Sequence, residues 1–195
     1  MSRSTLVKHF STWARGPIDV EEHVKPELIA LGVKDEIWFW ADDKLNSGII
    51  RGEIEHWEWP DNDGKITRCA DITYASQMEH EWQRLVCCKE MLHILDPIGT
   101  NKPEDVEALV EKIILPADLQ DPFSDGQHAL TDRVAVTYAT AILFPLAARS
   151  TLMPVYEQRK ISLRRIADQM ELPLRSAALV MSDVWLEIHE LLVSD

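Results

Sequence analysis

Three side chains within five residues have types and a spacing that could do chemistry: Lys89, Glu90 and His93. They lie in the run K-E-M-L-H, which differs from the zinc-binding pattern H-E-x-x-H at its first position. In the full pattern two histidines share one helix face and bind zinc, and the glutamate activates the water on the metal. Here the first histidine is replaced by a side chain that normally carries a positive charge. Any catalysis at this site therefore depends on Lys89.

A single helix must position these side chains, because residues 79–96 contain no glycine or proline. The segments 36–41, 49–59 and 65–74 are rich in aromatic and branched residues, and turn-forming residues separate them. We expect them to form an antiparallel meander of about three strands that leads into the helix. The predicted fold class is α+β, with this small sheet packed on a mainly helical domain.

Further helices are predicted on both sides of this core. They cover residues 2–14, 20–31 (capped by Asp19), 104–115, 132–144 (capped by Thr131), 163–170 (capped by Ser162) and 174–192. Residues 117–128 are expected to form a surface loop. We place a domain at residues 1–158 and a helical segment, packed on it, at 159–195.

Composition restricts the setting of the protein. The chain has 195 residues, 46% of them hydrophobic, and a net charge of −13. This charge disfavours nucleic acids and anionic membranes as partners. The odd set Cys69, Cys87 and Cys88 indicates a reducing compartment rather than a disulfide framework. No long apolar run is present, so we expect a cytoplasmic protein without a membrane span.

The order of three motifs resembles the ImmA/IrrE-like metallopeptidase family, from about Pro17 onward. The family's zinc helix, R-F-x-x-A-H-E-L-G-H, is matched by Arg84, Leu85, Glu90 and His93. Its acidic helix, E-x-x-A-N-x-F-A-x-x-L-L-M-P, is matched by Asp132, Ala135, Tyr138, Ala139, Ile142, Leu143 and Pro145. Its S-L-x-x-L-A segment is matched by Ser162, Leu163, Ile166 and Ala167. The departures are Lys89 for the first histidine, Leu92 for the glycine of that helix and Val136 for asparagine.

This resemblance implies a zincin-like domain followed by a helix-turn-helix-like segment. It also implies His93 and Asp132 as metal ligands and Glu90 as the general base of a zinc endopeptidase. Two protein ligands fall short of the three that a catalytic zinc site normally has. We therefore expect the metal-free form, with Lys89 paired to Glu90 or Asp132, and zinc stays the alternative cofactor.

The expected function follows the same comparison. The family acts on regulatory proteins in mobile elements and stress responses, and here a degenerate, weakly active or inactive peptidase would bind or control such a protein. An edge strand could then take up an extended partner segment. One alternative is an active zinc endopeptidase that cleaves a repressor, and another is an assembly protein of a phage or mobile element.

A third alternative uses the C-terminal segment as a DNA-binding helix-turn-helix over residues 159–185. Arg164, Arg165 and Arg175 make this part locally basic, and they are the candidate DNA-contacting residues. The would-be recognition helix, R-S-A-A-L-V-M-S-D-V-W, has few side chains that could read bases. Packing on the core or on a partner is therefore the favoured role.

Overall fold

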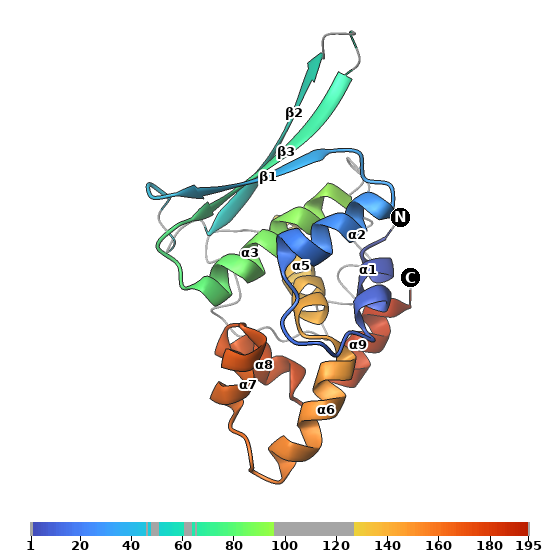
Figure 1. The fold of residues 1–195 in the computed structure, drawn as a ribbon, viewed down its shortest axis with the longest axis vertical. Helices are drawn as coiled ribbons and strands as arrows, with labels where there is room; N and C mark the ends of the chain where they lie inside the picture. The colour runs from blue at the N-terminus through green and yellow to red at the C-terminus, as the bar shows by residue number, and fades with distance from the viewer. Residues whose placement is uncertain are drawn as a thin grey trace.

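The chain folds as a small sheet packed on a set of helices (Figure 1). The computed structural model describes residues 2–45, 47, 51–60, 64, 66–95 and 127–194, and their side chains except those of 127–132. The helices of the N-terminal half are α1 (Arg3–Phe10), the π-helical turn η1 (Val20–Val24), α2 (Lys25–Ala30), α3 (His80–Leu92) and the 3₁₀ turn η2 (His93–Leu95). The strands are β1 (Glu36–Asp42), β2 (Gly52–Pro60) and β3 (Ile66–Ala75). The C-terminal half has α5 (Gln127–Leu143), α6 (Leu146–Glu157), α7 (Leu163–Met170), α8 (Leu174–Val180) and α9 (Trp185–Val193).

The sheet confirms the α+β class but corrects the predicted meander. Its order is β1-β3-β2, with β2 antiparallel and β1 parallel to β3. The central strand β3 buries Ala70 and Ile72 completely, whereas most of β2 is exposed. Of the two hairpin strands, the more apolar β3 takes the central position with neighbours on both sides. The more polar β2 lies at an edge.

The two faces of the sheet differ in cover. Ile37, Ile72 and Ile54 lie on one face and contact the hydrophobic core, and α3 packs against this inner face. Gly52, where β2 begins, lets the strand approach α3 closely, because a Cβ there would lie 2.4 Å from Val86 Cγ1 of α3. The opposite face, which we call the outer face, carries the alternate residues. They are Glu36, Trp38, Trp40 and Asp42 of β1, Thr67, Cys69, Asp71, Thr73 and Ala75 of β3, and Glu53, Glu55, Trp57 and Trp59 of β2.

Helix boundaries follow the capping residues where these are strong. Asp19 accepts hydrogen bonds from the backbone N–H groups of Glu21 and Glu22, and Ser162 accepts one from Arg165. Both predicted caps are therefore confirmed. The predicted cap at Thr131 is wrong, because α5 begins at Gln127 and Thr131 lies inside it. The predicted helix 104–115 lies outside the described residues, as does the loop at 117–128 apart from its last two residues, which begin α5.

Several predicted helices are shorter or divided in the structure. The segment 174–192 forms α8 and α9 with a break at 181–184. The guanidinium of Arg149 fills the gap: Nε donates to the Val180 carbonyl at 2.7 Å and a terminal nitrogen donates to Ser182 at 3.1 Å. A buried side chain thus satisfies carbonyls that a continuous helix would have used. Likewise the N-terminal helix ends at Phe10 rather than near residue 14.

Helix α5 forms the centre of the core. Its residues 134–143 are buried along nearly the whole length, and it packs against α3 on one side and α1 on another. The largest fully buried side chains, Trp185, Phe10 and Phe144, belong to the same hydrophobic cluster. Among the described residues no single helix is long and apolar enough to cross a membrane, and the α5–α6 pair that reaches this length bends by 74°.

Candidate functional site

Helix α3 brings two of the predicted site residues together at its C-terminal end. Glu90 lies inside the helix and is 4% exposed, while His93 is the C-cap and begins the 3₁₀ turn. The α-helix therefore ends earlier than predicted, yet the spacing still places Glu90 Oε2 4.0 Å from His93 Nε2. The pair faces the beginning of β2, since a Cβ on Gly52 would lie 3.4 Å from Glu90 Cγ.

Lys89 pairs with the predicted general base. Its ammonium Nζ lies 2.7 Å from Glu90 Oε1, and the two side chains are 12% and 5% exposed. Neighbouring residues on a helix point about 100° apart, so the lysine chain folds back to make this contact. In this shielded position a charge pair is screened little by water. The predicted pairing of Lys89 with Glu90 is thus present in the structure.

A second cation, which the sequence gave no reason to expect, reaches the site from α1. Arg3 donates to the Leu92 carbonyl at 3.4 Å and approaches His93 Nδ1 at 3.4 Å. Its guanidinium also lies over the Tyr138 ring of α5, 5.9 Å from the centroid. A guanidinium only donates hydrogen bonds, so a neutral His93 accepts at Nδ1 and carries its proton on Nε2. No short motif could reveal Arg3, because its role comes from the packing of α1 beside α5.

The fourth predicted residue, Asp132, belongs to α5, which packs against α3. Its side chain lies outside the described residues. In the described part of the chain, no group of three His, Cys, Asp or Glu side chains is arranged to hold a metal ion.

The described residues by themselves do not supply the donors of a catalytic zinc ion, and the side chain of Asp132 is not among them. The position of the first histidine holds a lysine whose ammonium already contacts the base. The nitrogen of His93 that faces Glu90 carries a proton when Arg3 occupies the other one. Zinc needs unprotonated nitrogen or anionic donors, and a catalytic site offers three of them. The arrangement instead forms a compact polar cluster of two cations, one carboxylate and one imidazole.

The two cysteines beside this cluster are packing residues. Cys87 and Cys88 are 8% and 0% exposed. Burial, assisted by the charges of Glu21 and Glu90, raises the pKa of Cys87 to about 12. Burial also raises the pKa of Cys88. Both thiols therefore stay protonated at neutral pH, and neither supplies a thiolate nucleophile.

Arg84, which the family comparison singled out, acts as a clamp in the structure. It is 7% exposed and donates to the carbonyls of Ile18, Met170 and Glu171. Burial lowers the pKa of its guanidinium, and the nearby Glu171 carboxylate raises it to a lesser extent. The last two carbonyls lie at the end of α7, so Arg84 joins the central helix to the C-terminal segment.

The C-terminal pair α7 and α8 presents the candidate DNA-contacting residues at the surface. Arg164, Arg165 and Arg175 are exposed, and Arg164 Nε lies 3.1 Å from Asp168 Oδ1. Helix α8 has seven residues and exposes Leu174 beside Arg175. Its surface thus offers few groups that could read base edges, and DNA binding stays a prediction.

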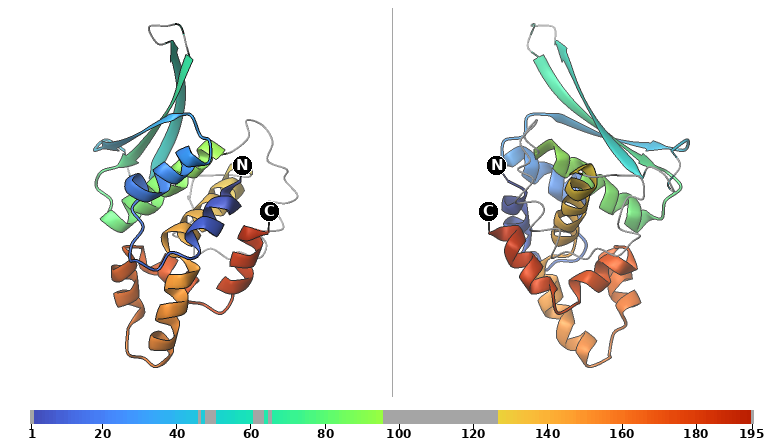
Figure 2. Two further views of the ribbon diagram at one scale, coloured as in Figure 1. Left: turned by 45° about the vertical axis from the view of Figure 1, so that its right-hand side comes forward. Right: turned by 180° about the vertical axis from the view of Figure 1, so that it is seen from behind.

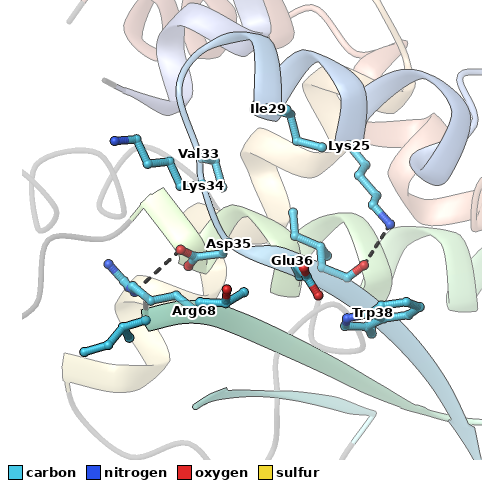
Figure 3. A pocket seen from close by; sticks show the side chains of 11 residues that line it. Lys25, Ile29, Val33, Lys34, Asp35, Glu36, Trp38 and Arg68 are labelled. Carbon is cyan, nitrogen blue, oxygen red and sulfur yellow. Dashed lines mark hydrogen bonds and ion pairs between the residues drawn. The ribbon is translucent and has the colours of Figure 1, made fainter. Parts of the chain in front are cut away.

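A surface pocket of about 640 Å³ lies beside the free edge of β1 (Figure 3). Arg68 faces Asp35 across it, with Arg68 Nε 3.5 Å from Asp35 Oδ1. Lys25 of α2 reaches the edge strand and donates to the Ile37 carbonyl at 2.7 Å. At the free edge of β1, where an extended partner segment could pair, the Ile37 carbonyl is therefore already hydrogen-bonded within the chain.

Comparison with known proteins does not assign this chain to a family. No protein-family model matches the chain, and no curated protein matches it. The resemblance to the ImmA/IrrE-like family rests on the three sequence motifs alone.

Proposed function

We propose that this chain is a degenerate, non-hydrolytic protein of the ImmA/IrrE-like peptidase fold that binds or controls a regulatory protein. The observation that carries the proposal is the 2.7 Å contact between Lys89 Nζ and Glu90 Oε1. A general base must have a free carboxylate oxygen directed at the water that it activates. Here one oxygen is held by an ammonium and the other faces His93.

The surroundings of the pair support the same conclusion. Lys89 and Arg3 bring two positive charges to the place where the family resemblance would put a zinc ion. Cations repel a divalent metal, and they balance the buried carboxylate without it. The setting in a mobile element or stress response, and the regulatory partner, come from the resemblance alone.

The test compares the natural chain with Lys89→His and Lys89→Gln. Each is purified at neutral pH without chelators, and zinc is counted by elemental analysis. We expect substoichiometric zinc and no peptide hydrolysis for the natural chain. Lys89→His restores the two-histidine pattern and is expected to gain zinc, whereas Lys89→Gln removes the charge without adding a ligand and is expected to stay metal-free.

Two results would overturn the proposal. Stoichiometric zinc in the natural chain, with hydrolysis that Glu90→Gln abolishes, would identify an active endopeptidase. A folded chain that carries both Lys89→His and Arg3→Gln and still binds no zinc would show that the scaffold is not that of the zinc peptidases.

A further inference from the structure

The outer face of the sheet exposes four large aromatic side chains. Trp38 and Trp40 of β1 are 49% and 53% exposed, and Trp57 and Trp59 of β2 are 40% and 48% exposed. The indoles of Trp57 and Trp59 meet edge to face with centroids 5.5 Å apart. Tryptophan is costly to leave in water, so its concentration on one face needs an explanation.

None of the described helices covers this face. Helices α2 and α3 lie on the inner side of the sheet, and the β2–β3 ribbon extends beyond them (Figure 1). Since a packed tryptophan covers roughly 150–250 Å², half exposure of four leaves on the order of 400 Å² of indole surface open. Apolar patches of this size commonly mark binding surfaces.

Acidic side chains surround the indoles. The outer face carries Glu36, Asp42, Glu53, Glu55 and Asp71, and its strand positions include no lysine or arginine. Among the described residues, a nearby cation is Lys25 of α2, whose ammonium lies 6.0 Å from the Trp38 ring centroid at the β1 edge. Carboxylates and indole rings both attract cations, the rings through their negative faces.

Asp71 lies at the centre of this arrangement with one oxygen unsatisfied. It stands opposite Trp38 in the register of β1 and β3. Its Oδ2 accepts a hydrogen bond from Trp57 Nε1 at 3.0 Å. Its Oδ1 is shielded from solvent and has no hydrogen-bond partner. A buried acceptor without a partner is unfavourable, and a charged donor is the strongest group that could satisfy it.

We infer that the outer face is the docking surface for an extended, arginine- or lysine-rich segment of a partner protein. A cationic side chain lies against the exposed Trp57 indole, where the adjacent Asp71 carboxylate attracts it. This rests on the protein-binding part of the proposed function and names the chemistry of the partner. A second copy of the chain fits less well, because the two acidic faces would repel each other.

The spacing of the indoles suits an extended occupant. Trp38 and Trp40, like Trp57 and Trp59, are two residues apart on a strand, which is about 6.6–6.8 Å. Alternate side chains of an extended segment repeat at the same distance. Cations at every second position of the partner could therefore meet successive indoles and carboxylates.

The test uses a synthetic ten-residue peptide of alternating arginine and threonine, titrated calorimetrically into the full chain. Matched peptides of alternating glutamate and threonine, and of serine and threonine, serve as controls. We expect binding of the arginine peptide alone, with an affinity that falls as salt rises. Asp71→Asn keeps the side-chain shape, and Trp57→Thr keeps a strand-forming residue. Each is expected to weaken binding by about tenfold or more.

Two substitutions on α9 provide matched controls for this face. Leu186→Thr removes an exposed apolar side chain and Glu187→Gln removes an exposed charge. Both should leave the affinity within about twofold, since neither lies on the sheet. Circular dichroism of each variant checks that it is folded.

Several outcomes would overturn the inference. One is an affinity that Asp71→Asn and Trp57→Thr leave unchanged, and another is equal binding of the serine–threonine peptide. Self-association of the free chain that Trp38→Thr abolishes would instead assign the face to a second copy. Cleavage of the bound peptide in a Glu90-dependent manner would overturn the non-hydrolytic function but leave the docking surface standing.

Discussion

Lys89 and Arg84 lie on the same helix, but one contacts the predicted general base and the other holds the fold together. Lys89 stands where the H-E-x-x-H pattern has its first histidine, and it contacts the predicted base. Arg84 is a residue of the same motif, yet its guanidinium is used to hold three carbonyls from distant segments. The motif therefore combines one position that alters chemistry with another that secures the fold.

Removing the Arg84 clamp should destabilise the protein strongly. Arg84→Met keeps the length of the side chain but leaves buried carbonyls of Ile18 and Met170 without a donor. We expect a loss of roughly 3 kcal/mol in the free energy of unfolding. Urea unfolding measures it, with Arg164→Met as the control, because Arg164 is exposed and should cost within about 0.5 kcal/mol. Equal losses in the two variants would contradict the clamp.

At the scale of elements, the contact between β2 and α3 sets the position of Glu90. Gly52→Ala places a methyl group 2.4 Å from Val86 Cγ1 and 3.1 Å from the Thr73 carbonyl oxygen. Overpacking of this kind costs about 1–3 kcal/mol. Adding Val86→Ala removes the closer clash, so the double variant should be more stable than the sum of the single losses by about 1 kcal/mol. Strictly additive losses in urea unfolding would show that strand and helix do not approach so closely.

Local sequence features predicted the elements better than their arrangement. Asp19 and Ser162 gave correct helix starts because capping depends on a few neighbouring residues. The hairpin of β2 and β3 is likewise antiparallel as expected. The parallel pairing of β1 could not be read from turn residues, since it depends on which hairpin strand buries more apolar surface.

The candidate site likewise contains residues that the sequence could predict and residues that it could not. Glu90 and His93 were predictable from their spacing along one helix. Arg3 and Gly52 were not, because each reaches the site through packing of an element distant in sequence. The break between α8 and α9 also depends on a distant residue, Arg149.

At the scale of the whole molecule, the two ends of the chain close the fold together (Figure 2). Helix α9 packs against α1, and His189 Nε2 lies 3.1 Å from Ser11 Oγ. His189 is 6% exposed, and burial lowers its pKa below the usual 6.5, an effect that Glu190 partly offsets. The junction of the termini therefore contains a group that resists protonation.

Acidification should weaken this junction. The unfolded chain binds a proton at His189 as the pH falls through about 6.5, whereas the folded chain binds it only at lower pH. Stability attributable to His189 is thus complete at pH 8 and declines as the pH falls below 6.5. Urea unfolding at pH 8 and pH 5 measures the decline, which His189→Gln should reduce. An identical pH dependence in both chains would exclude His189 as its source.

The uneven placement of tryptophan has a consequence for spectroscopy. Trp185 is completely buried, whereas the four indoles of the outer face are about half exposed. Solvated indoles emit at longer wavelengths than buried ones, so the native emission is already shifted to the red. Unfolding then changes the total emission only modestly, and the signal of the core comes from Trp185 together with the partly buried Trp13 and Trp82. Occupation of the outer face should move the emission to the blue without any change in the fold.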